Sequence, residues 1–268
     1  MSGTSMDGID VAYLESDGEA IGHLGGHLTV PYTKQFREKL RALIASDSGR
    51  ERDIKSARKS VEDELTSLHA AAVMRFMSEE NLSSTDVDLV GFHGHTVDHN
   101  PNRGCTVQIG DGPTLSRLLR LPVVHDFRSN DVRHGGQGAP LAPIFHAALF
   151  AAVEKPTAVL NIGGVANVTW IGKEWHSMVS FDTGPGNALI DDWVQAHGAG
   201  DYDESGKNAA AGAVDYAILE MLLQDPYFIA HPPKSLDRNT FSGACVEGLT
   251  LEDGAATLAM FTARSIGL

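Results

Sequence analysis

The chain has 268 residues, of which 42% are hydrophobic and 21% charged, an ordinary globular composition that can fill the cores of two domains. The formal net charge of −14 argues against nucleic acid as the main partner, and no apolar run approaches the ~20 residues that a membrane helix needs. Two widely separated cysteines and a polar N-terminus without signal-peptide features favour a reducing cytoplasm.

The first quarter of the chain predicts two strands followed by two helices. Apolar and polar residues alternate over 9–14, and a second strand is expected over 21–30. Apolar residues at three- and four-residue spacing predict helices over 33–45 and 51–77. Such a mixture of strands and helices favours an α/β fold.

A polar loop with two glycines, GTSMDGID at residues 3–10, leads into the first strand. Its Thr and Ser donors and the carboxylates of Asp7 and Asp10 suit the phosphates of a nucleotide and its Mg²⁺. Short glycine motifs also arise by chance, so a hairpin turn with polar decoration is the simpler interpretation of this segment alone.

Three histidines follow a predicted strand at 87–92. In an extended chain His93 and His95 would face the same way, which zinc binding could use together with His99. The nearby sequence holds no cysteine and no second acidic cluster. It therefore favours polar contacts to a substrate, or internally satisfied histidines, over a metal site.

Short strands are predicted over 105–110 and 122–125, with a helix over 114–120 between them. Residues 126–143 then form the densest mixture of polar residues and glycine in the chain. Its donors and acceptors suit a polyhydroxylated ligand with a carboxylate, and a long surface loop is the alternative. A helix over 144–153 ends near Lys155-Pro156, the expected boundary between domains 1–155 and 156–268.

The segment 157–187 carries the clearest pattern. Apolar runs flank the turn Asn161-Ile162-Gly163-Gly164, which predicts a hairpin with buried arms. A third run over 178–181 ends at Asp182, ahead of a helix at 188–196. Glycine lets a backbone approach a ligand closely, and α/β proteins place their chemistry at the ends of buried strands.

The last part of the chain predicts helices over 209–223 and 251–266, separated by a proline-rich connector. Within this proline-rich segment Lys234 and Arg238 flank Ser235 and Asp237. The two cations could close over an anion, and a solvated loop is an equally good interpretation.

Eight motifs spread over essentially the whole chain resemble, in the same order, those of the anhydro-N-acetylmuramic acid kinases. They are GTSMDGID (3–10), GFHGHT (91–96), TVQIG (106–110), DFRSNDV (126–132), GGQGAPLAP (135–143), NIGGVANVT (161–169), FDTGPGN (181–187) and PPKS (232–235).

The resemblance implies the two-domain α/β architecture of actin, hexokinase and Hsp70, with a deep cleft between the domains. It implies a bacterial cytoplasmic enzyme of peptidoglycan recycling. That enzyme would use ATP and water to convert 1,6-anhydro-N-acetylmuramic acid into N-acetylmuramic acid 6-phosphate and ADP. Resemblance also points to a homodimer, and neither a membrane nor a nucleic acid is expected as a partner.

The resemblance further implies roles for single residues. Asp182 is expected to be the general base that activates water at the anomeric carbon. Mg²⁺ is expected near Asp7 or Asp10. The expected nucleotide-binding residues are Gly3, Thr4, Ser5, Met6, Asp7, Gly8, Ile9, Asp10, Gly163, Gly164 and Asn167. The expected sugar-binding residues are Thr96, Gln108, Arg128, Asp131, Gln137, Gly184 and Asn187. An arginine is a sensible partner for the lactyl carboxylate.

The chain departs from the family pattern in three places. His95 replaces a usual Gln, and we expect this to alter a sugar contact. The chain begins at the first phosphate loop, and it ends at Leu268 before the glycine-rich motif that cradles adenosine, so the second domain is expected to be incomplete. Two alternatives are a sugar-binding remnant without ATP turnover and an ATP-independent hydrolase. The hydrolase would need a second carboxylate at a set distance, for which the sequence offers no clear candidate.

Overall fold

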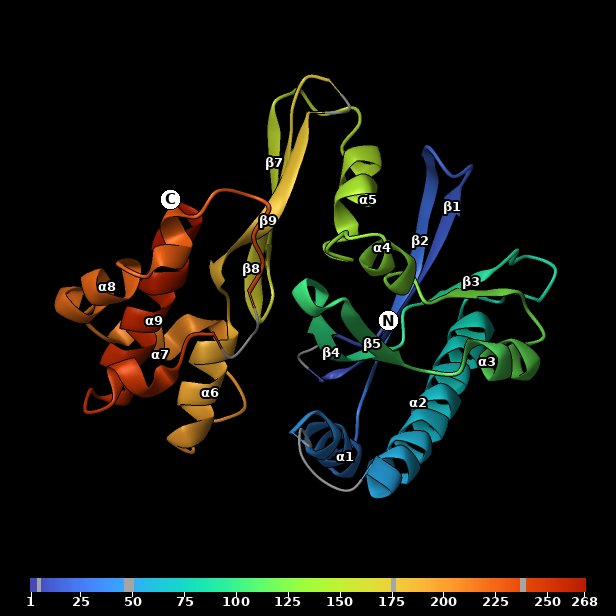
Figure 1. The fold of residues 1–268 in the computed structure, drawn as a ribbon, viewed down its shortest axis with the longest axis horizontal. Coiled ribbons are helices and arrows are strands. Elements are labelled where there is room, and N and C mark those ends of the chain that lie inside the picture. The colour runs from blue at the N-terminus through green and yellow to red at the C-terminus, as the bar shows by residue number, and fades with distance from the viewer. Residues whose placement is uncertain (4–5, 46–50, 175–176, 237–239) are drawn as a thin grey trace. The chain divides into compact units, whose positions relative to one another are not determined.

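The structure is a computed structural model that describes residues 1–3, 6–45, 51–174, 177–236 and 240–268. The chain packs as two compact units, Met1–Leu141 and Ala142–Leu268 (Figure 1). Both combine helices and strands, as expected for an α/β protein. The expected domains 1–155 and 156–268 stay a prediction. Helix α5 (Ala142–Leu149) belongs to the second compact unit, because it packs on a strand of that unit.

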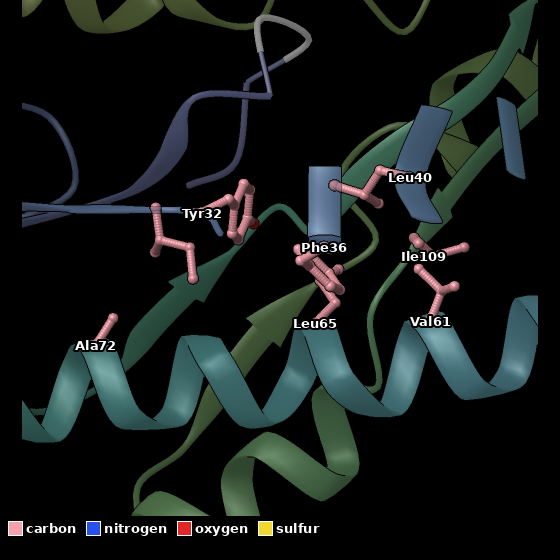
Figure 2. Packing of buried hydrophobic residues seen from close by; sticks show 8 residues of the cluster. Tyr32, Phe36, Leu40, Val61, Leu65, Ala72 and Ile109 are labelled. Atoms are coloured by element: carbon pink, nitrogen blue, oxygen red, sulfur yellow. The ribbon is translucent and has the colours of Figure 1, made fainter. Parts of the chain in front are cut away.

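The first unit begins with the expected antiparallel hairpin and two helices. Strands β1 (Gly8–Ser16) and β2 (Ile21–Pro31) pair from Gly8 opposite Pro31 to Ser16 opposite Ile21. Helices α1 (Lys34–Ala45) and α2 (Glu51–Glu79) confirm the two helix predictions. Their apolar faces meet in a core with β1 and β5 (Cys105–Ile109), and Figure 2 shows the packing of α1 and α2 with Ile109 of β5. This core contains Ile9, Tyr32, Phe36, Leu40, Val61, Leu65, Ala72 and Ile109.

The rest of the first unit consists of two short strand pairs and two helices. The parallel pair is β3 (Val90–Phe92) with β6 (Val123–His125), and the antiparallel pair is β4 (His95–Asn100) with β5 (Cys105–Ile109), joined by the 3₁₀ turn η1 (Pro101–Arg103). Helix α3 (Gly112–Leu119) starts where the Asp111 carboxylate caps the amide of Thr114. Within residues 126–143, where the sequence predicted no helix, the structure has helix α4 (Ser129–Arg133).

The second unit is built around the antiparallel sheet β7-β8-β9. Strands β7 (Thr157–Ile162) and β8 (Val165–Ile171) confirm the hairpin, with Gly163-Gly164 as its turn, and β9 (Met178–Pro185) follows. The expectation that both arms are buried is wrong for β7. Leu160 and Ile162 are each 43% exposed, because β7 lies at the edge of the described sheet.

The helices of the second unit pack around α9 (Leu251–Ile266), where Ala255, Leu258 and Phe261 are buried. The helices predicted over 188–196 and 251–266 are confirmed, and the single helix expected over 209–223 is wrong. The chain is extended at Gly212, where a Cβ would lie 2.1 Å from the carbonyl oxygen of Glu252. The other elements are α6 (Ala188–Ala196), η2 (Glu204–Gly206), α7 (Lys207–Ala211), α8 (Tyr216–Leu223), η3 (Pro226–Ile229) and η4 (Gly243–Val246). Among the described residues, no helix combines the length and hydrophobicity that crossing a bilayer demands.

Candidate active site

Asp182 lies inside β9, opposite Asn167 of β8. The sequence placed it at the end of a strand, but β9 continues to Pro185. A β-bulge makes this continuation possible. Asn167 pairs with Asp182 and Ala166 with Gly184, so Thr183 is the extra residue, and its hydroxyl donates to the carbonyl oxygen of Ala166. Bulges of this kind commonly redirect a side chain beside an active site.

The Asp182 carboxylate is half-buried and held in place. Its Oδ2 accepts a hydrogen bond from the amide of Leu236 at 2.8 Å. Burial raises the pKa of Asp182 above its usual value, and the Leu236 amide opposes that rise with a smaller effect. A carboxylate with a raised pKa accepts a proton more readily, as a general base must.

Tyr227 and Lys234 both hydrogen-bond to the main chain of Asp182. The Tyr227 hydroxyl donates to the carbonyl oxygen of Asp182, and the Asp182 amide donates to that of Lys234 at 3.2 Å. Burial, followed by the Asp182 charge, raises the pKa of Tyr227, so the phenol stays protonated. The Lys234 ammonium lies 4.6 Å from the centre of the Tyr227 ring and 5.5 Å from that of Phe181.

Sequence reasoning assigned no role to Tyr227 or Leu236, because their contacts to Asp182 span 45 and 54 residues. For Lys234, an anion contact stays a prediction. Arg238, which was expected to share it, lies outside the described residues.

The Gly163-Gly164 turn is fastened to the start of α6. Asn187 donates from its amide to the Gly163 carbonyl at 2.7 Å and from its side chain to the Ile162 carbonyl at 3.1 Å. Neither turn glycine has a positive φ, and a Cβ at either would meet other atoms only at 3.6 Å or beyond. The fold therefore does not require glycine at these two positions, which leaves open space beside the turn.

A hollow of about 430 Å³ begins at Asn187, next to this turn. Its volume could take part of a nucleotide. The lining residues are Asn187, Ile190, Asp191, Tyr202, Asp203, Gly206, Ala209 and Ala259.

Gly184 has a packing role in the structure. A Cβ there would lie 2.3 Å from Oγ of Ser265 on α9, so glycine is needed for the close approach of strand and helix. Its expected sugar contact stays a prediction.

In the first unit, Thr96 and Gln108 face each other across β4 and β5. The Gln108 amide nitrogen donates to the hydroxyls of Thr106 at 2.9 Å and Thr96 at 3.3 Å. Its buried Oε1 has no hydrogen-bond partner among the described residues. Because this oxygen is buried, the expected sugar contact of Gln108 stays a prediction.

Arg128 joins the loop before α4 to His93. Its Nε donates to His93 Nε2 at 2.9 Å, and Nη1 donates to the carbonyl oxygen of Gly138. The Gly138 amide donates in turn to Asp131 at 2.7 Å. Burial and then the Arg128 charge lower the pKa of His99, whose ring also bonds the backbone of Gln137. These contacts bring Arg128, Asp131 and Gln137 together with the β4–β5 pair.

The histidines are arranged differently from the extended pair that we expected. Gly94, with φ +71°, interrupts the extended conformation between His93 and His95. A Cβ at this position would lie 2.4 Å from the Ile109 carbonyl oxygen. His93 Nδ1 donates to the Gly94 carbonyl, and His99 Nδ1 contacts the Thr106 hydroxyl. The three rings therefore make separate polar contacts within the protein.

The effect of His95 on a sugar contact stays a prediction, and the structure shows the ring inside the core. The side chain is 0% exposed, and Nδ1 contacts the Ser2 hydroxyl at 2.9 Å. Ser2 also accepts a hydrogen bond from Tyr32 at 2.8 Å. The buried His95 thus fixes the position of Ser2, just before the loop that begins at Gly3.

The loop at residues 3–10 closes through Met1 and Asp10, whose main chains hydrogen-bond, and through a bridge between Ser2 and Ile9. Asp7 and Asp10 are both exposed. Burial raises the pKa of Tyr32 to about 12, and the charges of both carboxylates add to the effect, so both lie near this ring. Thr4 and Ser5 lie outside the described residues.

Comparison with known proteins places the chain in a family. The family model described as Anhydro-N-acetylmuramic acid kinase matches residues 1–267. A protein named anhydro-N-acetylmuramic acid kinase from Methylobacterium nodulans is 51% identical, covering 99% of this chain and 75% of its own length. Proteins of the same name from Paramagnetospirillum magneticum and Rhizorhabdus wittichii are 46% and 48% identical, each covering 100% of this chain and 74% of its own length. The chain belongs to the anhydro-N-acetylmuramic acid kinase family.

Proposed function

We propose that the chain is an ATP-dependent kinase that opens 1,6-anhydro-N-acetylmuramic acid with water and yields N-acetylmuramic acid 6-phosphate. Family membership supports the reaction. The observation that carries its chemistry is Asp182, a held, half-buried carboxylate whose pKa is raised. The proposed role of the enzyme in peptidoglycan recycling follows from its substrate.

In this proposal Asp182 takes a proton from water as the water oxygen bonds to the anomeric carbon C1. The bond from C1 to O6 breaks, and the electron pair stays on O6. O6 then bonds to the γ-phosphorus of ATP, and ADP leaves. Phosphoryl transfer depends mainly on positioning and on neutralising charge, so Asp182 is the one general base that the reaction requires of this chain.

The residues present suit ATP and Mg²⁺. The open space at Gly163 and Gly164 allows a phosphate to approach the backbone of the turn. Mg²⁺ is usually held by one or two carboxylates, waters and substrate phosphates, which fits the exposed pair Asp7 and Asp10. When bound, the ion would neutralise charge on the transferring phosphoryl group.

The sugar-binding proposal rests on the polar cluster of the first unit. Thr96 and Gln108 are half-buried polar residues that bond each other, and Arg128 offers a guanidinium to the lactyl carboxylate. The wider proposal includes the architecture of actin, hexokinase and Hsp70. Two compact units, each carrying one of the phosphate loops, support it. A homodimer and a cytoplasmic location also belong to the proposal and rest on the resemblance.

Neither alternative is favoured. Identities of 46–51% to kinases over nearly the whole chain argue against both a remnant without turnover and an ATP-independent hydrolase.

The deciding experiment measures ADP release at saturating Mg-ATP, with and without 1,6-anhydro-N-acetylmuramic acid. We expect release only with the sugar and a sugar 6-phosphate as product. Sugar binding by calorimetry without ADP release would support the remnant, and ring opening without ATP would support the hydrolase.

A further inference from the structure

Residues 226–236, here called the connector, hold Asp182 at three points. Tyr227 donates to its carbonyl oxygen, Lys234 accepts from its amide, and Leu236 donates to its carboxylate. All three contacts lie within the second unit. One short segment therefore contacts both the main chain and the side chain of the proposed base.

The main-chain contacts show how the connector reaches the sheet. The amide and the carbonyl of a strand residue point to the same side in an antiparallel sheet. At Asp182 both groups bond the connector, so they point away from β8. The connector thus covers the edge of β9 at the position of the base.

The side-chain contact makes the two carboxylate oxygens unequal. A hydrogen bond from the Leu236 amide stabilises negative charge on Oδ2 and opposes protonation there. Oδ1 is left as the more basic oxygen. The geometry also fixes the rotation of the carboxylate, so Oδ1 has one direction in which to take a proton.

Lys234 links the two ends of the connector and also contacts β9. Its ammonium donates to the carbonyl oxygen of Tyr227 at 3.0 Å, and it lies near the rings of both Tyr227 and Phe181. Phe181 immediately precedes Asp182 in β9. One cation therefore couples the two ends of the connector to the strand that carries the base.

We infer that the connector is the positioning element of the general base: the Leu236 amide holds Oδ2, Oδ1 takes the proton from water, and Tyr227 with Lys234 keeps the connector on β9. The inference rests on the proposed role of Asp182. It makes Tyr227 and Leu236 positioning residues, which act on the reaction through Asp182.

The first test is Tyr227→Phe, which removes only the hydroxyl. We expect kcat to fall about 10-fold while KM for ATP and for the sugar changes less than about 2-fold, because the base shifts while the binding groups stay. Tyr216→Phe, at a tyrosine of α8 that is 61% exposed, is the matched control and should match the wild type. An unchanged kcat in Tyr227→Phe would overturn the role of Tyr227.

The second test compares Leu236→Pro with Leu236→Ala. Both lose the leucine side chain, and only proline also loses the N–H. Without that donor the pKa of Asp182 should rise, so the acid limb of the kcat profile should move to higher pH in the proline variant and stay in place in the alanine variant. Identical profiles for the two folded variants would overturn the assignment of Oδ2.

A third measurement separates this inference from the function itself. Carbon NMR of protein with labelled aspartate carboxyls gives the pKa of Asp182 directly, with Asp182→Asn identifying its signal. This titration needs no turnover. Should the wild type release no ADP with the sugar, the proposed function fails, and a higher Asp182 pKa in Leu236→Pro than in Leu236→Ala still supports the connector. Equal values would refute it.

Discussion

The hydroxyl of Ser2 and Nδ1 of His95 lie 2.9 Å apart in the core of the first unit, although 93 residues separate them in the sequence. His95 is fully buried, and its Nε2 has no partner among the described residues. Burial, aided by nearby His93, lowers the pKa of His95 to about 4. His69, also buried, has its pKa lowered to about 4, again chiefly by burial. Both rings are therefore neutral in the folded protein.

This pair of histidines predicts a loss of stability in mild acid. A folded-state pKa of about 4 lies below the unfolded value of 6.5, so the unfolded chain binds more protons between these values. The stabilisation is complete above pH 6.5 and disappears as pH falls toward 4, by up to roughly 3 kcal/mol per histidine. Urea unfolding from pH 7 to 4 measures it. In His95→Gln the slope should be shallower than in the wild type, with the other buried histidines still contributing, and an unchanged slope would contradict the prediction.

Replacing Asp182 with Asn should abolish turnover without abolishing sugar binding. An amide of nearly the same shape cannot accept the proton from water, so we expect kcat to fall by a factor of about 10² to 10⁴. Calorimetry with the sugar and thermal unfolding provide the controls, since both should stay close to the wild type. Normal turnover in this variant would mean that another group is the base.

Arg128 should determine the preference for a sugar that carries a carboxylate. We expect Arg128→Lys to lower kcat/KM for 1,6-anhydro-N-acetylmuramic acid about 10-fold or more, because lysine lacks the planar fork that binds a carboxylate. An anhydro sugar without the lactyl group should be affected much less. Arg133→Lys is the control, since Arg133 is exposed and bonds only the Ser129 carbonyl among the contacts described. Equal effects of the two substitutions would argue against a role for Arg128.

Two glycines near the turn should respond to alanine in opposite ways. At Gly164 a Cβ meets only Ala188, at 3.6 Å, so stability should hold while KM for ATP rises several-fold if a phosphate approaches there. At Gly186 a Cβ would lie 2.1 Å from the Gly163 carbonyl oxygen, so Gly186→Ala should lower the free energy of unfolding by about 2 kcal/mol or more. Thermal unfolding and ATP titration of both variants test this. A stable Gly164→Ala with unchanged KM would speak against a phosphate at the turn.

The sequence predicted best those elements whose signals are local. Helix α9 begins where Thr250 caps the amide of Asp253, and its apolar spacing continues to Ile266, so both of its ends were correct. The Gly163-Gly164 hairpin was equally clear. These elements depend on neighbours in sequence, which a pattern captures.

The failures have tertiary causes. Gly212 interrupts an apolar pattern because the backbone passes close to Glu252, a contact that no local pattern reveals. The buried His95 ring bonds through Nδ1 to Ser2, 93 residues away in the sequence, and no local pattern reveals such a contact. For the proposed site, the eight motifs pointed to Asp182, while the contacts of Tyr227 and Leu236 became visible only in the fold, where the connector lies along β9.

Because of the bulge at Thr183, the number of residues in this part of β9 matters more than which residues they are. Side chains alternate along a strand, and one extra residue reverses that alternation for everything on one side of it. Losing or gaining a single residue between Asp182 and the start of α6 would either turn the Asp182 carboxylate away from the Leu236 amide or shift the pairing that leads into α6. The segment FDTGPGN should therefore tolerate substitutions at some positions while excluding any change in its length.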